Sequence, residues 1–465
     1  MKIGVDNLAR ISNAEVEMKN LTLFVGQNST HKSYMAHVLY EFYKEVASLK
    51  NNYGVLSRFV NTISKKIQQN FQSELEYLLS LKNEYIEGIE QHQIDVGQWQ
   101  DEEFTILKIY FTDNDKRLVE FFSNINSLLF GELSKKINDS FNINKDILQK
   151  LYIKNFKKSI KKSMSVTFSA PLEHFSEDED EIKYRVVNTL VRDLITTLTN
   201  ELDNYHSSYY FPASRTGFVL TLDEIYAGIF RDKFRGQVSA TRLGEPTIDF
   251  IQTFADIKTG KINELMGYPN LLLNKRISNK SKKLVDFLEK NIIKGKIKEV
   301  RNEQDYASYY LEINGEDLDL HLASSATLET LPFIVFLKNT KDISNTFFVI
   351  EEPEAHLHPK AQIQMARFIV MLSNAGAKVL VTTHSDYILN EINNCIKLNS
   401  IDTKDNFAIS KDSVSAYLFK NQKEITSVNP LKIDKYGIAN DNFDEVLDEL
   451  LERSSELSET ILDDK

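Results

Sequence analysis

The sequence predicts an α/β fold in which helices cover a sheet with parallel strands. In the second half of the chain, short apolar runs of strand length alternate with longer stretches whose apolar residues recur at helical spacing, as in βαβ units. Glycine and proline are scarce, at 16 and 8 of 465 residues, which favours long helices and few tight loops. Because 42% of the residues are hydrophobic and 26% are charged, collagen-like, mucin-like and disordered classes are excluded.

The N-terminal part is predicted to begin with two strands. Residues 7–18 contain an alternating apolar pattern, and Leu21–Val25 is a nearly continuous apolar run typical of a buried strand. Residues 34–165 lack proline and carry apolar side chains at helical spacing. We therefore expect a mostly helical insertion at 45–205, after a short N-terminal part of the main domain at 1–44.

The second half of the chain returns to the sheet. Residues 208–218 predict a strand with a Pro-Ala-Ser turn, residues 222–294 have a helical pattern, and residues 296–322 predict a small β-meander with a hairpin turn at Asn314–Gly315. Helices and buried strands then alternate, at 328–338, 346–350, 360–373 and 378–382. We expect residues 206–440 to complete the main domain.

The net charge of −11 is concentrated at the C-terminal end. Residues 441–465 hold ten acidic residues against Arg453 and Lys465, a local net charge of −8, which leaves −3 for the rest of the chain. The same segment carries an apolar stripe at helical spacing, so we expect an acidic helical tail that docks within this chain or onto a partner. The acidic total does not exclude local contact with nucleic acid.

The chain contains a single cysteine, Cys395, which excludes an internal disulfide and a cysteine-based zinc cluster. The first residues include an acid where a signal peptide needs an apolar stretch, and nowhere do 18 uncharged apolar residues run together. We therefore expect a cytoplasmic protein without membrane contact.

A tight loop after the first buried strand has the composition of a phosphate-binding loop. It leads into a predicted helix at 34–43 and consists of Gly26, Gln27, Asn28, Ser29, Thr30, His31, Lys32 and Ser33. In the usual Gly-x4-Gly-Lys-Ser/Thr pattern, backbone N–H groups cradle phosphates, the lysine reaches the β- and γ-phosphates, and the serine ligates Mg²⁺. Here His31 replaces the second glycine, so its side chain must point away from the phosphates. Taken alone, the loop fits a phosphate site and an ordinary strand-to-helix turn equally well.

Two adjacent acids follow the predicted strand at 346–350. Glu351 is the candidate to hold Mg²⁺ or its water, and Glu352 is the candidate to orient or deprotonate an attacking water. The alternative is a buried strand that meets a helix N-terminus, where acids are favoured. The Pro-Glu-Ala-His-Leu-His-Pro sequence that follows favours the catalytic interpretation. After the strand at 378–382, His384 is placed to bond a γ-phosphate, although a lone histidine is more often structural.

Taken together and in this order, the motifs resemble the ABC-type ATPases of the SMC, RecF and OLD group, especially the stand-alone OLD-like ATPases of bacterial phage-defence systems. The resemblance covers residues 1–44 and 296–440 and includes the turn at 212–215, and its most specific part is 351–359. It implies an α/β P-loop NTPase of the ABC/SMC-head type, with an N-terminal antiparallel β part and a large helical insertion.

The resemblance also implies a role for each motif. Walker A would include Lys32 and Ser33, Walker B would be Glu351 and Glu352, the D-loop would lie at 354–358, and the switch histidine would be His384. The implied cofactors are ATP and Mg²⁺. Glu352, His384 and Glu351 would be catalytic, and Ser33 and Glu351 would be the metal ligands.

The family's signature motif is expected just before the Walker B strand. Ser324 and Ser325 lie there at a predicted helix start, and the resemblance implies that they contact the γ-phosphate bound by the opposite subunit, with Ala326 in place of the family's glycine. A serine N-cap with Glu329 in the first turn uses the same geometry, so both interpretations stay open. Because His31 and Ala326 replace glycines that let backbone approach phosphate, we expect slow hydrolysis, suited to a switch rather than a motor.

By analogy with the ATPase subunits of Septu and PARIS systems, the resemblance implies a homodimer or higher oligomer that holds or releases a separate effector, expected to be a nuclease. OLD proteins that cut DNA carry a C-terminal TOPRIM domain, and with 81 residues after His384 we expect none in this chain. A lysine-rich helix predicted at 154–162 and a basic region at 275–298 are either solvated surfaces or contacts for DNA or RNA phosphates.

The rival hypothesis is a RecF/SMC-like clamp for DNA repair or genome maintenance, in which DNA stimulates the ATPase directly and no protein effector is bound. A transporter subunit fits poorly with the long helical insertion. A pseudo-ATPase that only binds nucleotide stays open because of His31.

Overall fold

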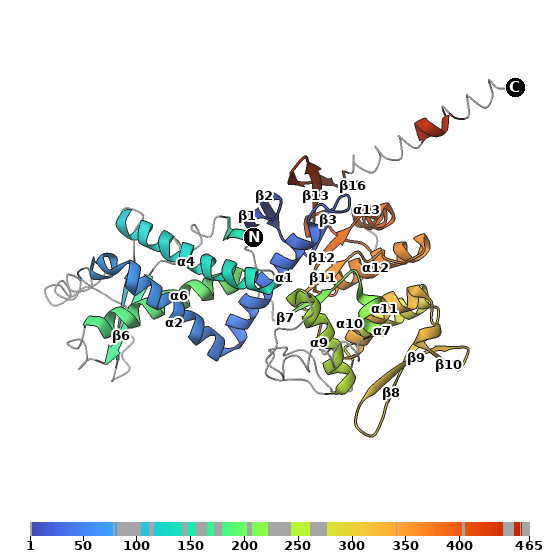
Figure 1. Ribbon diagram of the computed structural model, residues 1–465, viewed down its shortest axis with the longest axis horizontal. Helices are drawn as coiled ribbons and strands as arrows, with labels where there is room; N and C mark the ends of the chain where they lie inside the picture. Colours follow the sequence, from blue (N-terminus) through green and yellow to red (C-terminus); the bar gives the residue numbers. More distant parts are fainter. Residues whose placement is uncertain are drawn as a thin grey trace.

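The computed structural model describes residues 2–77, 80, 104–110, 116–141, 147–154, 165–171, 179–201, 207–221, 243–260, 277–340, 342–401, 405–439, 451–455 and 457. A head built on a nine-stranded sheet continues into an elongated helical arm (Figure 1). Both the first and the last strands of the chain lie in the head, so the arm is inserted between them.

The large sheet is mixed. Its strand order is β5 (Leu148–Ile153), β1 (Lys2–Leu8), β2 (Ile11–Glu17), β14 (Ile425–Pro430), β13 (Val414–Gln422), β3 (Leu21–Val25), β12 (Lys378–Thr383), β11 (Thr346–Glu351) and β7 (Ser207–Phe211). Strands β13, β3, β12, β11 and β7 pair in parallel, whereas β5, β1 and β2 pair antiparallel. The predicted α/β fold with an antiparallel N-terminal part is therefore confirmed.

The prediction of a single strand at 7–18 is wrong, because this segment includes a hairpin turn. β1 and β2 are separate antiparallel strands, and Asn7 and Ala9 adopt left-handed backbone conformations where the chain reverses, with φ of 49° and 53°. The sequence pattern did not separate β1 from β2 because the turn between them is short and the apolar alternation does not reveal its backbone angles.

The insertion is not only helical. Within 45–205, β5 pairs with β1 and so extends the head sheet, and β4 (Phe104–Tyr110) pairs with β6 (Ser165–Pro171). β5 has only six residues, which is too short for periodicity to separate a strand from a helix. This strand anchors the inserted segment to the head.

Helices cover both faces of the sheet. One face carries α1 (Lys32–Asn51), and its core includes Phe347 and Val349 of β11. The opposite face, with Phe348 and Ile350, packs against a second helical layer. That layer consists of α7 (Arg215–Leu220), α9 (Glu245–Thr259), α10 (Asn279–Leu288), α11 (Ser325–Lys338), α12 (Pro359–Asn374) and α13 (Asp386–Ser400).

The predicted β-meander is confirmed as a small antiparallel sheet of β8 (Lys296–Arg301), β9 (Ala307–Ile313) and β10 (Glu316–Asp319). Asn314 and Gly315 turn the chain with φ of 53° and 84°, as a two-residue hairpin requires. The short strands β15 (Ile433–Asp434) and β16 (Gly437–Ile438) form a further hairpin. The predicted helices and strands between 328 and 382 are also confirmed, as α11, β11, α12 and β12.

The arm is formed by α2 (Tyr53–Asn70), α4 (Lys116–Ser140) and α6 (Glu179–Glu201), and α1 runs into it from the head (Figure 1). All three arm helices contact α1. One continuous apolar core includes residues of α1, of the arm helices and of one sheet face. Helix α1 therefore links the loop at 26–33, which precedes it, with the arm.

Several expectations fall wholly or partly outside the described residues. Of the basic helix at 154–162, only Lys154 is described, and its ammonium pairs with Glu15 at 2.5 Å. Most of the acidic tail at 441–465 and parts of 222–294 are likewise outside. None of the helices in the described part of the chain is long and apolar enough to cross a membrane.

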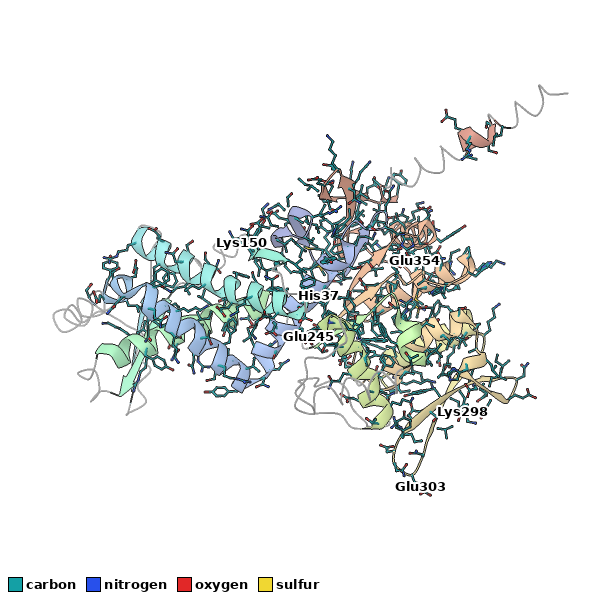
Figure 2. All side chains as sticks on the ribbon, viewed as in Figure 1. His37, Lys150, Glu245, Lys298, Glu303 and Glu354 are labelled. Carbon is teal, nitrogen blue, oxygen red and sulfur yellow. The ribbon has the colours of Figure 1, made fainter. Side chains whose placement is uncertain are left out.

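A buried histidine, His37, lies where α1 meets the end of α4 (Figure 2). Its ring stacks on Phe141 with 3.9 Å between ring centroids, and its Nε2 lies 2.9 Å from the hydroxyl of Ser140. Burial, together with the nearby Lys44 ammonium, lowers the pKa of His37 to about 3. His37 is therefore neutral in the folded protein at ordinary pH.

The free energy of unfolding is expected to fall as the pH drops below about 6.5. The folded-state pKa of about 3 lies below the reference value of 6.5, so acid protonates the unfolded chain first and favours it. This contribution has a slope of up to about 1.4 kcal/mol per pH unit. Urea denaturation across this range measures it, and His37→Gln should remove the His37 component. An unchanged slope in His37→Gln would contradict the prediction.

Candidate active site

The carboxyl ends of three adjacent parallel strands bring the sequence-predicted residues together. The loop at 26–33 follows β3, Glu351 and Glu352 end or follow β11, and His384 follows β12, which lies between the other two strands. In open α/β sheets, ligands bind outside this edge. The predicted site residues from three distant parts of the chain thus share one edge.

The ammonium of Lys32 is folded into its own loop. Its Nζ donates to the carbonyl oxygens of Gly26 and Gln27, at 2.8 and 2.7 Å. Burial lowers the pKa of Lys32, while the acidic side chains at 351, 352 and 354 act in the opposite direction. The loop therefore holds a buried cation beside a cluster of carboxylates.

The N-terminus of α1 lacks a side-chain cap. His31 is its N-cap residue but makes no capping hydrogen bond, and no acid lies in the first turn. Among the other head helices, α7 and α9 also lack a side-chain cap, whereas α11, α12 and α13 are capped by Ser324, His358 and Ser385. The first N–H groups of α1 are thus left for an anion, which the helix dipole also favours.

His31 adopts the backbone conformation that the replaced glycine would supply. Its φ is 62°, in the left-handed region. The imidazole lies outside the loop, with Nδ1 3.2 Å from the hydroxyl of Thr426 on β14 and the ring 5.5 Å from that of Tyr34. These contacts offset the cost of placing a non-glycine residue in this region.

Gly26 cannot carry a side chain. Its φ of 142° is a conformation that L residues rarely adopt, and an added Cβ would lie 2.2 Å from the backbone oxygen of Phe419 on β13. The first glycine of the loop is therefore required by the sheet packing beneath it.

Gly26→Ala is expected to lower the free energy of unfolding by about 3 kcal/mol, because both backbone strain and the clash must be relieved. Urea denaturation measures the change. Gly131→Ala in α4 is the matched control, since a Cβ there meets nothing within 4 Å and alanine favours the helix. Equal stability of Gly26→Ala and the unmodified protein would contradict this account of the loop.

Glu351 is buried and lies beside Ser33. Burial raises the pKa of Glu351, against hydrogen bonds from the hydroxyls of Ser33 and Tyr210 and from the backbone of Ala213, which lower it. Within the described residues, its Oε1 is buried without a hydrogen-bond partner. A hydroxyl and a carboxylate with a spare buried oxygen are a donor set that fits Mg²⁺, which takes one or two protein ligands alongside substrate phosphates.

Glu352 and His384 face one another across neighbouring strands. The Nδ1 of His384 lies 3.8 Å from Oε1 of Glu352 and 3.5 Å from Oε1 of Glu354. The same oxygen of Glu354 accepts hydrogen bonds, both at 2.8 Å, from the backbone N–H of His384 and the hydroxyl of Thr383. Glu354 therefore holds the segment that carries His384.

Glu352 sits in a constrained turn. Its φ is 40°, and its N–H donates to the carbonyl oxygen of Thr382 at 2.9 Å. Non-glycine residues with such angles persist only where the surroundings hold them, and they concentrate at functional sites. This outlier is a further reason to regard Glu352 as functional.

Ser324 and Ser325 are exposed at the start of α11. Ser324 is the N-cap residue, and its hydroxyl accepts from the N–H of Thr327 at 3.3 Å. The serine N-cap is thus confirmed, whereas the expected acid in the first turn is not, because Glu329 lies beyond that turn. Because both serines are exposed, the same helix end is accessible to a second molecule.

The family of the chain follows from a comparison with known domains. The AAA ATPase domain family matches residues 1–389. The chain belongs to this family. The match includes the loop at 26–33, the acids at 351 and 352, and His384, and it agrees with the α/β architecture.

Among solved structures, this AAA ATPase domain aligns with heads of SMC proteins. One is an SmcHead bound to the C-winged helix domain of ScpA, with 13% identity and a TM-score of 0.35, covering 93% of this chain and 98% of that one. The SMC head domain from Thermotoga maritima has 9% identity and a TM-score of 0.32, with coverages of 93% and 98%. An Smc head with an extended coiled coil, bound to the C-terminal domain of ScpA derived from Pyrococcus furiosus, has 12% identity and a TM-score of 0.32, with coverages of 97% and 98%. At these TM-scores the alignments add nothing to the family assignment. A search of curated proteins finds no match.

Four buried polar residues of the AAA ATPase domain were not predicted as site residues from the sequence. Tyr210 bonds to Glu351, Glu354 holds His384, and Arg215 forms an ion pair with Glu329 beneath the acids. The signal for Arg215 was present in the turn at 212–215, which belonged to the family resemblance. Glu354 likewise lies in the motif at 351–359, within the D-loop at 354–358 that the resemblance implied. Tyr210 and Glu329 lie within apolar segments, where nothing in the local pattern separates them from the core.

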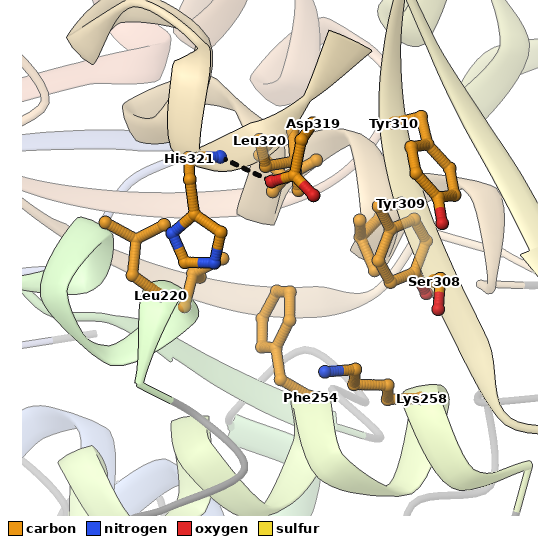
Figure 3. A pocket seen from close by; sticks show the side chains of 12 residues that line it. Leu220, Phe254, Lys258, Ser308, Tyr309, Tyr310, Asp319, Leu320 and His321 are labelled. Atoms are coloured by element: carbon orange, nitrogen blue, oxygen red, sulfur yellow. Dashed lines mark hydrogen bonds between the residues drawn. The ribbon is translucent and has the colours of Figure 1, made fainter. Parts of the chain in front are cut away.

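A separate cavity of about 300 Å³ lies against the side of α11. Its lining includes Phe254, Lys258, Tyr309, Asp319 and His321 (Figure 3). None of its lining residues belongs to the loop at 26–33 or to the cluster of acids. This cavity is therefore distinct from the candidate site.

Proposed function

We propose that this AAA ATPase domain binds ATP with Mg²⁺ at the edge formed by β3, β12 and β11 and hydrolyses it slowly. One observation carries the proposal. The buried cation of Lys32, the Ser33–Glu351 pair and the Glu352–His384 pair converge there, next to the uncapped start of α1. Phosphoryl transfer uses a cation and a metal ion to stabilise the phosphate charge and a side chain to orient the attacking water. The three groups near the start of α1 match these needs.

The loop binds the phosphates. The N–H groups of residues 26–33 and the start of α1 surround them, and the ammonium of Lys32 leaves the carbonyl oxygens of its own loop to reach the β- and γ-phosphates. Ser33 and Glu351 hold Mg²⁺, which neutralises charge on the phosphate oxygens when bound.

Glu352 and His384 act on the reacting groups. Glu352 orients the attacking water and accepts its proton, and the imidazole of His384 donates to the γ-phosphate. Glu354 fixes the backbone of His384 and so acts as a positioning residue. The 3.8 Å separation of His384 and Glu352 lets loss of the γ-phosphate alter both groups together.

Two copies of the chain face one another across the nucleotides. The exposed Ser324 and Ser325 of one copy contact the γ-phosphate held by the other, so ATP stabilises a homodimer or a higher oligomer. Turnover is slow because His31 and Ala326 occupy positions where glycine would give the backbone more freedom near phosphate.

The assembly serves as an ATP switch in a bacterial antiviral defence system, as in the OLD-like, Septu and PARIS ATPases that the motifs resemble. It holds or activates a separate effector, a nuclease, in the cytoplasm. Helix α1 supports the switch, since it begins at Lys32 and packs against the arm helices, which makes the arm responsive to the loop. The lysine-rich segment at 154–162 contacts DNA or RNA.

The proposal is tested by a pull-down of the Glu352→Gln protein from its native host with ATP present, with bound proteins identified by mass spectrometry. A stoichiometric nuclease that is retained by Glu352→Gln and lost with Lys32→Ala would support the ATP-gated scaffold. Recovery of DNA without a stoichiometric protein would contradict it and favour the RecF/SMC-like repair clamp.

A further inference from the structure

Arg215 is completely buried at the start of α7, directly after β7. Arginine is almost never fully buried unless it is paired. Its guanidinium donates to three backbone carbonyl oxygens, those of Pro212 at 3.2 Å, Glu351 at 2.9 Å and Glu352 at 3.3 Å. A further contact of 3.5 Å reaches the carbonyl oxygen of Pro353. One side chain thus binds the backbone of three consecutive residues that include both candidate carboxylates.

The same guanidinium also binds α11. Its Nε lies 2.9 Å from Oε2 of Glu329 and 3.2 Å from the backbone oxygen of that residue. Glu329 is completely buried and lies about one turn after the exposed Ser324 and Ser325. The Arg215–Glu329 pair therefore connects the helix that carries these serines to the strand end that carries the acids.

We propose that Arg215 is a positioning residue that couples the two halves of the nucleotide site. It fixes the backbone at Glu351 and Glu352, and through Glu329 it ties that backbone to the start of α11. A displacement of the serines by a second copy of the chain is thereby transmitted to the carboxylates of the same copy. This inference rests on the proposed ATPase function.

The geometry favours positioning over simple filling of the core. A buried ion pair is often replaced by apolar residues without loss of stability, so stability alone does not require one here. A planar guanidinium can bind several carbonyl oxygens and a carboxylate at once, whereas a lysine ammonium is a point charge. Glu352, at φ of 40°, needs support from outside its own segment, and Arg215 supplies it on the carbonyl side while Thr382 supplies it on the N–H side.

The experiment is a double-mutant cycle on kcat and on ATP affinity with Arg215→Lys, Glu329→Gln and the double variant. Arg215→Lys keeps the positive charge but loses the planar guanidinium that binds several oxygens at once. It should lower kcat by about 100-fold, because Glu352 is then misplaced. ATP affinity should change far less than kcat, because the hydrogen bonds of Arg215 reach the backbone at 351–353 and not the loop at 26–33. Glu329→Gln should lower kcat less, and the double variant should be no slower than Arg215→Lys, since both act on one connection.

Arg301→Lys is the matched control, because Arg301 also pairs with a glutamate but on β8, outside the site. Urea denaturation of every variant shows that it is folded, and the near-isosteric Glu329→Gln keeps the test valid if Arg215→Lys is unstable. Unchanged kcat in both single variants, or fully additive effects, would overturn the coupling.

The unmodified protein and Glu352→Gln are assayed together with the variants. Normal hydrolysis by the unmodified protein with no effect in the variants would overturn only the coupling, whereas no hydrolysis by the unmodified protein would overturn the proposed function as well.

Discussion

Replacing Glu352 with glutamine is expected to lower kcat for ATP hydrolysis by about 1,000-fold and to leave ATP binding intact. The amide is nearly isosteric, so the turn at φ of 40° and the approach to His384 are retained. It cannot accept a proton from water, and that is the step assigned to this side chain. Steady-state hydrolysis and equilibrium binding of ATP, measured on the same preparation, separate the two effects.

Glu303→Gln is the control for this substitution. Glu303 is exposed in the turn between β8 and β9, well away from Glu354 in Figure 2. It should hydrolyse ATP at the rate of the unmodified protein. Undiminished hydrolysis by Glu352→Gln would show that another group acts on the water.

Replacing Lys32 with alanine is expected to weaken ATP binding by about 100-fold, because charge-assisted hydrogen bonds to two phosphates are lost. The same change removes a buried cation from beside the acids at 351, 352 and 354, so the remaining site repels the phosphates. Titration with ATP and Mg²⁺ measures the loss of affinity. A thermal melt without nucleotide shows whether the variant still folds, since it loses the hydrogen bonds from Lys32 to two loop carbonyl oxygens.

Lys298→Ala is the matched control. Lys298 lies on the small sheet, where its ammonium pairs with Asp317 at 2.5 Å (Figure 2). Its loss should not change ATP affinity. If Lys32→Ala bound ATP as tightly as the Lys298 control, the loop at 26–33 would not be the phosphate site.

The three site segments could be predicted because each is local. Apolar runs that lead into Gly26, into Glu351–Glu352 and toward His384 each predict a buried strand, and parallel strands place their carboxyl ends along one edge. In the sheet, β12 lies between β3 and β11, so the three segments are neighbours. This is why motifs far apart in the chain lie together at one edge of the sheet, as parallel strands require.

The supporting residues could not be predicted, because their partners are distant. Arg215 pairs with Glu329 across 114 positions, and nothing in either local pattern identifies the other. The contact of His31 with Thr426 likewise depends on β14, which joins the sheet from the far end of the chain. The strand β5 was missed for the same reason, because its pairing with β1 is a tertiary choice that six residues of pattern do not show.

The central claim is tested most directly by an experimentally determined structure of the Glu352→Gln protein with ATP and Mg²⁺. The account predicts phosphates within the loop at 26–33, with the metal between Ser33 and Glu351, and Ser324 and Ser325 of a second copy at the γ-phosphate. Nucleotide bound elsewhere, for example in the cavity beside α11, or bound without contact to Lys32, would contradict it.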